Sequence, residues 1–210
     1  MFPSLSNVES NVDNLLINHD FKDLTNWELS NVDCKESAVA IFTDEEFSKY
    51  GKRVVALQAH DDVYGTELYQ DTVLLPKGEY TFSAYVKPSI YFDSGNNGGG
   101  MYLEVLKNGQ HFAESERITG NSTEYVRVVT SFSLIKEESV RVKLCVKGNG
   151  TVYFNAPQLE NNPNANQYNL LTNSNFEHEL NVWELTGDAQ LSSTENFNMS
   201  HSLCLSSNIN

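Results

Sequence analysis

The segment EYTFSAYVK, residues 79–87, has the clearest strand pattern in the chain. Its core-type residues occupy every second position: Tyr80, Phe82, Ala84 and Val86. Successive side chains of a β-strand point to opposite faces, so this alternation predicts a strand with one face in a core and the other toward solvent. Pro88 follows and ends the pattern, because proline has no backbone N–H to donate to a neighbouring strand.

Short segments of the same kind fill the chain up to residue 160. Further strands are predicted at residues 14–17, 37–43, 53–59, 67–75, 101–107, 110–114, 124–134, 139–147 and 151–160. Turn sequences such as Pro76-Lys77-Gly78 and Asn108-Gly109 separate them. No segment has a convincing helical period. The sequence therefore predicts an all-β fold, an antiparallel β-sandwich with two sheets around one core.

A phrase near the start of the chain occurs again near its end. NLLINHDF at residues 14–21 is matched by NLLTNSNF at residues 169–176, and WELS after residue 26 is matched by WELT after residue 182. Such a repeat marks a second copy of one structural unit. The expected organisation is a leader or linker at 1–13, a β-sandwich module at 14–160, a linker at 161–168, and the N-terminal part of a second, truncated copy at 169–210.

Charge and hydropathy limit the partners. The 210 residues include 28 acidic and 14 basic side chains, a net charge of −14. An acidic surface repels phosphate backbones, so we expect no nucleic-acid partner. No apolar run reaches the roughly 20 residues of a membrane-spanning helix, so we expect no membrane insertion. The N-terminus lacks the pattern of a signal peptide. This leaves an intracellular protein or an excerpt of a longer secreted one, and the incomplete repeat favours the excerpt.

Five motifs together carry a family resemblance. They are NLLINHDF followed by Trp27, RVVALQA at 53–59, GEYTFSAYVK at 78–87, EYVRVVTSFSL at 124–134 and GTVYFNAPQLE at 150–160. This combination resembles the galactose-binding-like jelly rolls, and more narrowly the carbohydrate-binding modules of the family 4/9/22 type. The junction QLENNPNANQYNLLTNSNFE is similar to the one between tandem modules of large bacterial surface proteins, including those with RHS/YD repeats.

The resemblance implies a function. The expected activity is non-catalytic binding of a glycan or polysaccharide on the concave sheet of the jelly roll. The expected location is extracellular or at the cell surface, in a larger protein that contains neighbouring modules of the same chain. The alternative is a structural spacer or protein-interaction module without a sugar site, because the same fold serves both purposes.

The resemblance also concerns a structural calcium ion, which such modules often carry. Its side-chain ligands include an acid just after the opening Phe and an Asp in the closing strand, and here those positions hold Lys22 and Asn155. Calcium prefers several oxygen ligands, with carboxylates supplying the charge. We therefore expect no metal in the first module, with Lys22 reaching the oxygens near Asn155 instead. The second copy retains an acid, Glu177.

Strand parity predicts the ligand-binding residues. A sugar site needs flat aromatic rings for the pyranose faces and polar groups for the hydroxyls. The residues expected to point outward on one concave sheet are Tyr85, Tyr102, Glu104, Arg127, Arg141 and Tyr153. The alternative is an ordinary solvated sheet face, on which tyrosines occur because they favour β-strands.

Catalysis has little support in the sequence. The five histidines are scattered without metal-ligand spacing, and no nucleophile elbow or zinc motif occurs. We therefore expect no enzyme activity and no catalytic residues. A pair of adjacent aromatic residues, Tyr91-Phe92, precedes a glycine-rich loop. This pair either forms a contact surface or pins the loop to the sandwich.

Overall fold

The computed structural model describes residues 14–31, 38–43, 53–120 and 122–166, together with the backbone of residues 189–192 and 202–205. The chain divides into two compact units, Met1–Tyr168 and Asn169–Asn210, which we treat separately. The predicted leader at 1–13 and the acid Glu177 lie outside the described residues.

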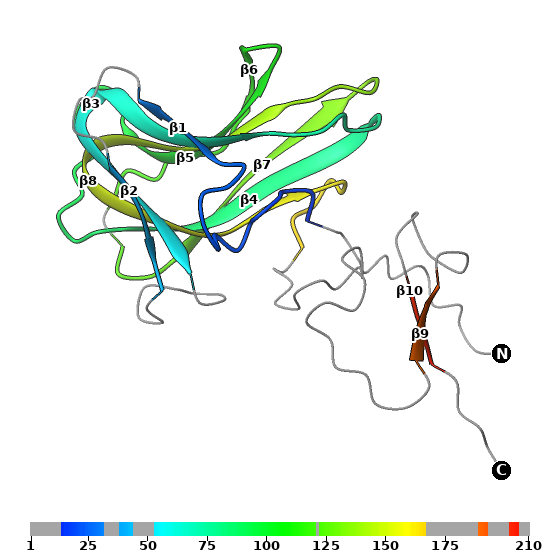
Figure 1. The fold of residues 1–210 in the computed structure, drawn as a ribbon. Helices are drawn as coiled ribbons and strands as arrows, with labels where there is room; N and C mark the ends of the chain where they lie inside the picture. The colour runs from blue at the N-terminus through cyan, green and yellow to red at the C-terminus, as the bar shows by residue number, and fades with distance from the viewer. Residues whose placement is uncertain are drawn as a thin grey trace, which may run out of the picture. The chain divides into compact units, whose positions relative to one another are not determined.

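The described part of the first unit contains eight strands (Figure 1). They are β1 (Glu28–Asn31), β2 (Ala38–Phe42), β3 (Val54–Asp71), β4 (Gly78–Pro88), β5 (Gly100–Lys107), β6 (Gln110–Glu114), β7 (Val126–Leu134) and β8 (Arg141–Glu160). All of their pairings are antiparallel. In the second unit, β9 (Ala189–Ser192) and β10 (Ser202–Leu205) form an antiparallel pair.

The two longest strands, β3 and β8, pass through both layers of the sandwich, and they curve from one layer to the other (Figure 1). We call the layer of β2, residues 54–61 of β3, residues 148–160 of β8, β4 and β7 the β4 sheet. We call the layer of β1, residues 65–71 of β3, residues 141–147 of β8, β5 and β6 the β5 sheet. The register of β3 against β8 shifts between Asp61 and Gly65, where the strands cross from one layer to the other.

The core lies between the two sheets. The four alternating residues of β4 that the sequence predicts to be inside are all 0% exposed. They share one apolar cluster with Leu103 of β5 and Leu144 of β8. The rings of Phe112 in β6 and Phe132 in β7 join the layers, with centroids 5.9 Å apart. The predicted all-β antiparallel sandwich is confirmed, and its architecture is that of a jelly roll.

Two strand predictions differ from the structure. Residues 53–59 and 67–75 were expected to form two strands, but one strand, β3, runs from Val54 to Asp71 and pairs with β8 on both sides of a register shift between Asp61 and Gly65. Likewise β8 joins the predicted strands 139–147 and 151–160. Gly148 and Gly150 have φ values of +142° and +127°. This backbone conformation bends β8 without ending it, so a turn sequence here marks the passage between layers.

The repeated phrase anchors the start of the module. Residues 14–17 do not form a strand, because Asn14 instead bonds to β8 through its side chain: Nδ2 donates to the carbonyl of Pro157 at 2.9 Å, and Oδ1 accepts from the N–H of Leu159 at 3.0 Å. The rings of Phe21 and Trp27 are both buried, with centroids 5.5 Å apart. The residues of this phrase that recur therefore form the packing and hydrogen bonds that close the sandwich.

Candidate functional site

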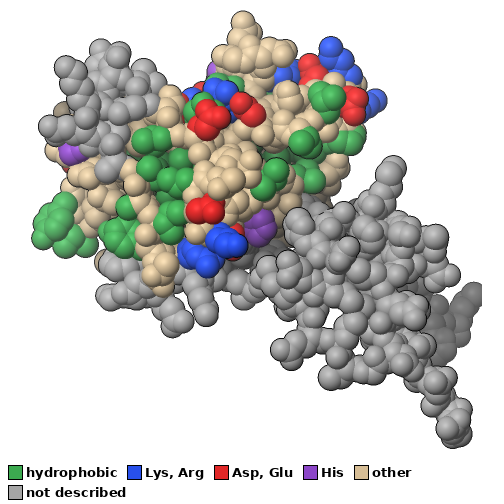
Figure 2. Space-filling view, in the orientation of Figure 1, with side chains coloured by type: hydrophobic (Ala, Val, Ile, Leu, Met, Phe, Trp, Pro, Cys, Tyr) green, Lys and Arg blue, Asp and Glu red, His purple; other side chains and the backbone are tan. Residues whose placement is uncertain are grey.

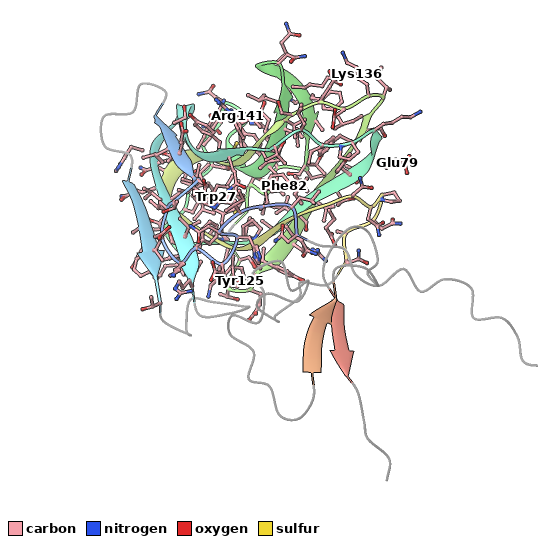
Figure 3. All side chains as sticks on the ribbon, turned by 45° about the vertical axis from the view of Figure 1, so that its right-hand side comes forward. Trp27, Glu79, Phe82, Tyr125, Lys136 and Arg141 are labelled. Atoms are coloured by element: carbon pink, nitrogen blue, oxygen red, sulfur yellow. The ribbon has the colours of Figure 1, made fainter. Side chains whose placement is uncertain are left out.

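The six predicted site residues lie on two opposite faces of the sandwich. Tyr85 pairs with Arg127 on β7 and with Asn155 on β8, and Tyr153 pairs with Lys87, so three of the six face outward from the β4 sheet. Tyr102, Glu104 and Arg141 face outward from the β5 sheet. Figure 3 places Arg141 and Tyr125 on opposite sides of the layer that contains Trp27 and Phe82. Parity therefore gave the correct side of each strand, but the six residues do not share one sheet.

A charged network covers the outer face of the β5 sheet. The ammonium of Lys143 lies 2.6 Å from Glu67 and 2.8 Å from Glu104. His111 Nδ1 lies 3.1 Å from the other oxygen of Glu104. Burial opposes ionisation of Glu104, but hydrogen bonds from Lys143 and His111 outweigh it and hold the pKa of this carboxyl below its usual value. For Lys143, burial lowers the pKa and the two carboxylate partners raise it, with a net rise.

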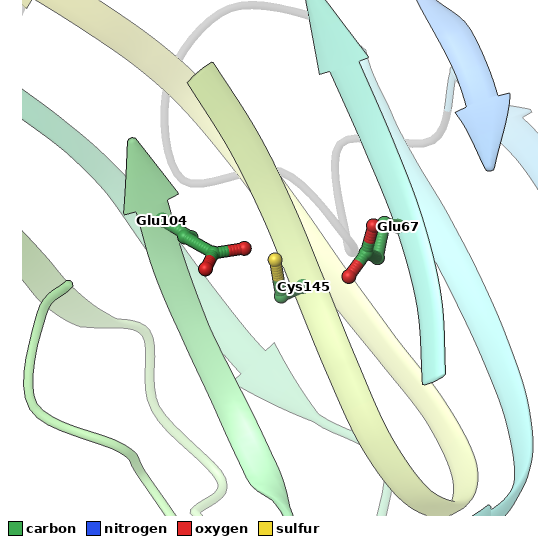
Figure 4. Close-up of side chains that lie close together, drawn as sticks. All are labelled: Glu67, Glu104 and Cys145. Carbon is green, nitrogen blue, oxygen red and sulfur yellow. The ribbon is translucent and has the colours of Figure 1, made fainter. Parts of the chain in front are cut away.

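The same face brings together three groups with metal-ligating atoms. Cys145 of β8 lies between Glu67 of β3 and Glu104 of β5 (Figure 4), and their ligand atoms are within 4.8 Å of one another. The ammonium of Lys143 already lies between the two carboxylates. Burial raises the pKa of the Cys145 thiol well above its usual value. A protonated thiol and two carboxylates already bridged by the ammonium of Lys143 do not fit a cation.

Two tyrosines of this face are covered by arginines. The guanidinium of Arg117 lies 3.9 Å from the ring centroid of Tyr102, and Arg141 lies at the same distance over Tyr69. Each arginine is held by a carboxylate, Glu114 for Arg117 and Asp71 for Arg141. As a result Tyr102 is only 3% exposed. The cations already occupy the ring faces on which a pyranose would stack.

The outer face of the β4 sheet carries a different pattern. Four aromatic residues lie on it: Phe42 of β2, Tyr153 of β8, Tyr85 of β4, and Tyr125, which directly precedes β7. We call them the aromatic row. The rings of Phe42 and Tyr153 meet edge to face, with centroids 6.0 Å apart. Lys87 Nζ lies 5.8 Å from the centroid of Tyr125. Arg127 lies 5.5 Å from that of Tyr85.

Sequence reasoning missed two members of the aromatic row. Tyr125 precedes Arg127 by two residues in the predicted strand 124–134, so strand parity predicts both on the same face. Burial raises the pKa of the Tyr125 hydroxyl, and Tyr153 adds to the rise. Phe42 is 38% exposed at the end of β2. Parity could have identified Tyr125, whereas the contact of Phe42 with Tyr153 depends on strand order.

The other end of this face is covered by the chain that follows β8. Residues 161–166 fold back over it, and the hydroxyl of Thr81 donates to the carbonyl of Asn162 at 2.7 Å. Asn166 donates from its backbone and side chain to the carboxylate of Glu160, at 3.0 and 3.1 Å. Arg127 donates to the hydroxyl of Ser83 and to the carbonyl of Asn166. Through Arg127, which lies over the ring of Tyr85, these residues reach one member of the aromatic row.

Asn155 and Lys22, the residues at the two positions compared with calcium ligands, have different surroundings. The side-chain amide of Asn155 is buried and donates to the carbonyl oxygen of Arg53 at 2.8 Å. Lys22 is exposed, and the expected contact of its ammonium with oxygens near Asn155 does not form among the described residues. Arg53 instead pairs with Asp20 at 3.2 Å. Asn155 therefore uses its amide as a hydrogen-bond donor here, where a calcium ligand would present an oxygen.

Charges on the described surface are mixed. On the face shown in Figure 2, acidic and basic side chains lie beside one another in small groups. The pairs include Arg141 with Asp71 and Arg117 with Glu114. No helix that is long and apolar enough to cross a membrane occurs in the part of the chain that the structure describes.

Comparison with known proteins identifies the fold. No protein-family model and no curated protein matches the chain. Among solved structures, TmCBM61 in complex with β-1,4-galactotriose is 19% identical, with 71% of this chain and 99% of that chain covered and a TM-score of 0.53. The fold is a jelly-roll β-sandwich. The tandem CBM22-1-CBM22-2 structure from Paenibacillus barcinonensis Xyn10C is 15% identical, with 94% and 62% covered and a TM-score of 0.52.

A further similar structure comes from a larger protein. The enzymatically active domain of bacteriophage CBA120 tailspike protein 4 is 13% identical over 70% of this chain, with a TM-score of 0.53. The match covers only 21% of that chain. At these identities the comparisons establish the fold, and the solved structures include sugar-binding modules among the proteins that share it.

Proposed function

We propose that residues 14–160 form a non-catalytic carbohydrate-binding module that binds a glycan on the outer face of the β4 sheet. The observation that carries this proposal is the aromatic row, four aromatic side chains gathered at one end of that face. Aromatic rings offer an apolar surface to the C–H groups of a pyranose, and Lys87 lies beside them to donate to its hydroxyls. Carbohydrate-binding modules with the same fold, including one with bound β-1,4-galactotriose, support it.

The six sequence-predicted residues separate into two roles. Tyr85 and Tyr153 would contact the sugar directly, and Arg127 would hold the ring of Tyr85 in place. Tyr102, Glu104 and Arg141 already have charged or stacked partners within the β5 sheet, and they stabilise that face. This division removes three residues from the expected site and adds Phe42 and Tyr125.

Weak binding at a single site suggests that the module works beside other modules in a larger protein. A shallow row of half-buried rings gives modest affinity, and neighbouring modules in one chain raise the effective concentration of sites. We place the chain in a larger surface or secreted protein, as a module beside others of the same kind. Its expected partner there is a polysaccharide that several modules bind together.

One observation favours the alternative of a spacer. Residues 161–166 cover part of the same face, and Arg127 bonds to the carbonyl of Asn166 rather than facing solvent alone. A sheet face covered by its own chain is what a spacer or a protein-interaction module of this fold would have. The two functions differ in whether a glycan binds to the aromatic row.

A glycan array with the full chain separates the two. We expect binding to a β-linked oligosaccharide, and we expect Tyr85→Ala to weaken it by about tenfold, since a lost aromatic contact is worth about 1.4 kcal/mol. Tyr69→Ala is the matched control, because Tyr69 faces outward on the opposite sheet beneath Arg141. Equal loss in both variants, or no bound glycan, would favour the spacer.

A further inference from the structure

The connection between β4 and β5, residues 89–99, is fixed to the bend of β8. Phe92 is 3% exposed. The backbones of Asp93 and Asn149 exchange two hydrogen bonds, of 2.8 and 2.7 Å. Ser89 donates from its backbone to the carbonyl of Thr151 at 2.8 Å. The sequence allows two roles for Tyr91-Phe92, a contact surface or an anchor that pins the loop to the sandwich. Phe92 has the second role.

Glycines in β8 allow this close approach. A Cβ atom at Gly148 would lie 2.4 Å from the carbonyl oxygen of Asp93 and 3.1 Å from the ring of Phe92. At Gly150 it would lie 2.9 Å from the Cα of Phe92. Both glycines have positive φ, a conformation that other residues rarely adopt. The loop backbone is therefore positioned by its own sequence and needs no ligand to order it.

The two residues before Phe92 are largely exposed to solvent. Tyr91 is 83% exposed and Ile90 is 69% exposed. A fixed backbone that holds adjacent large apolar side chains in solvent brings no benefit to folding, because neither side chain is removed from water. Exposed aromatic residues on a rigid loop are typical of a contact surface.

A pocket of ≈ 450 Å³ lies beside Tyr91. We call it the loop pocket, and its lining residues are Ile90, Tyr91, Phe92, Asp93, Ser94, Thr119 and Gly120. Thr119 comes from the connection between β6 and β7, which Ile118 fixes through two 3.0 Å backbone hydrogen bonds with Met101. Both walls of the pocket are therefore held by backbone bonds to the sandwich.

The loop pocket contains polar groups that can form hydrogen bonds with a ligand. Asp93 Oδ1 accepts from the N–H of Gly95 at 2.9 Å. Its second oxygen and the hydroxyls of Ser94 and Thr119 make no hydrogen bond with any residue that the structure describes. The pocket thus combines an aromatic ring, a carboxylate oxygen and two hydroxyls, and none of its described lining residues is basic. An anion is disfavoured by Asp93, and a purely apolar ligand would leave these polar groups unpaired.

We propose that the loop pocket is a second saccharide site, which binds one pyranose unit. The ring of Tyr91 stacks on the apolar face of the sugar. Asp93 accepts a hydrogen bond from a sugar hydroxyl, and Ser94 and Thr119 exchange hydrogen bonds with its neighbours. The volume suits one or two sugar units and not a long chain. This site is separate from the aromatic row and does not depend on it.

NMR titration of the full ¹⁵N-labelled chain tests the site. The probes are methyl β-D-galactopyranoside, methyl β-D-glucopyranoside and β-1,4-galactotriose. We expect at least one probe to give saturable amide shifts at Tyr91, Ser94, Thr119 and Gly120. Tyr91→Ala should weaken this binding by about tenfold, whereas Tyr91→Phe should retain it because the ring supplies the contact. Tyr85→Ala should leave these shifts unchanged.

The outcomes separate this inference from the proposed function. Loop shifts with none of the probes, or shifts that survive in Tyr91→Ala, would overturn the loop pocket as a saccharide site. Shifts confined to Tyr85 and Tyr153 would overturn it too and leave the sheet-face site intact. Shifts confined to the loop would support the pocket and count against the sheet face. Unchanged amide shifts elsewhere in each variant establish that it is folded.

Discussion

The ammonium of Lys143 lies 2.8 Å from the carboxylate of Glu104, on a face where both side chains are largely buried. It also lies 2.6 Å from Glu67. Lys143→Met would leave two partly buried carboxylates without their cation. We expect this variant to lose about 3 kcal/mol or more of unfolding free energy, as buried pairs do when one partner is removed. Urea denaturation near neutral pH measures the loss.

An exposed lysine provides the control for that variant. Lys136 pairs with Glu138 at 3.9 Å, and its side chain is 73% exposed. Lys136→Met should change the unfolding free energy by no more than about 0.5 kcal/mol, because solvent screens exposed ion pairs. Similar losses in the two variants would contradict a stabilising role for the network around Lys143.

Because of Glu104, the unfolding free energy should depend on pH in the acid range. Its carboxyl has a pKa below the ordinary 4.5, because hydrogen bonds from Lys143 and His111 outweigh the cost of burial. The folded state therefore binds this proton less readily than the unfolded state. The stabilisation is present above the unfolded pKa and is lost as the pH falls through the folded pKa. The gap in unfolding free energy between the wild type and Glu104→Gln should narrow from about pH 7 to about pH 3. A difference in unfolding free energy that stays constant over this pH range would contradict this role of Glu104.

Gly148 should be the most sensitive glycine of the β8 bend. Gly148→Ala forces a Cβ to within 2.4 Å of the Asp93 carbonyl at a φ of +142°. We expect a loss of about 2 kcal/mol or more, from backbone strain and displacement of the loop. Gly109→Ala is the control, because Gly109 also has positive φ but no atom within 4 Å of the added Cβ. It should cost only about 1 kcal/mol in the same denaturation experiment.

Calcium should not stabilise the first module. The amide of Asn155 donates to the Arg53 carbonyl, so this position presents an N–H where a cation needs oxygen. In a chain with Glu177→Gln, which removes the acid of the second copy, added calcium should leave the melting temperature unchanged. The further changes Lys22→Glu and Asn155→Asp should make it rise with calcium. A calcium-dependent rise in the chain with Glu177→Gln alone would show that the first module binds the ion without them.

Residues 161–166 should resist proteolysis because Glu160 holds Asn166. Glu160→Ala removes both of these hydrogen bonds, so proteinase K should cut faster between residues 161 and 166. Gln158→Ala is the matched control, since Gln158 is buried on the same face and its Oε1 has no hydrogen-bond partner in the described residues. Cleavage sites are read by mass spectrometry. Equal rates in the two variants would mean that Glu160 does not control the segment.

The fold was predictable from sequence because alternation is a local property. The pattern of residues 79–87 specifies which side of β4 is buried, whatever the neighbouring strands are. The repeat gave the boundaries 14–160, 161–168 and 169–210, which stay predictions. Strand ends were less predictable, because Gly148-Asn149-Gly150 is a turn sequence that the structure uses to bend one strand.

The site was less predictable because it depends on strand order. Tyr85 and Tyr102 both alternate with core residues, so parity places both outside. Only the pairing of β4 with the second half of β8, and of β5 with the first half, separates them onto opposite faces. Burial adds a second effect that no local pattern contains, since Arg117 comes from a connection fifteen residues after Tyr102 and covers its ring.

The bonds between Asn14 and β8 determine how the module would carry mechanical load. Leu15 donates to the carbonyl of Leu159 at 2.8 Å, and the Asn14 side chain bonds to Pro157 and Leu159. The chain therefore enters and leaves the sandwich at one point. Tension along a string of such modules would act first on this junction, at the end of β8, before it reached β3. Because those two strands belong to both layers, neither layer can be pulled out alone, and each module would extend in a single step.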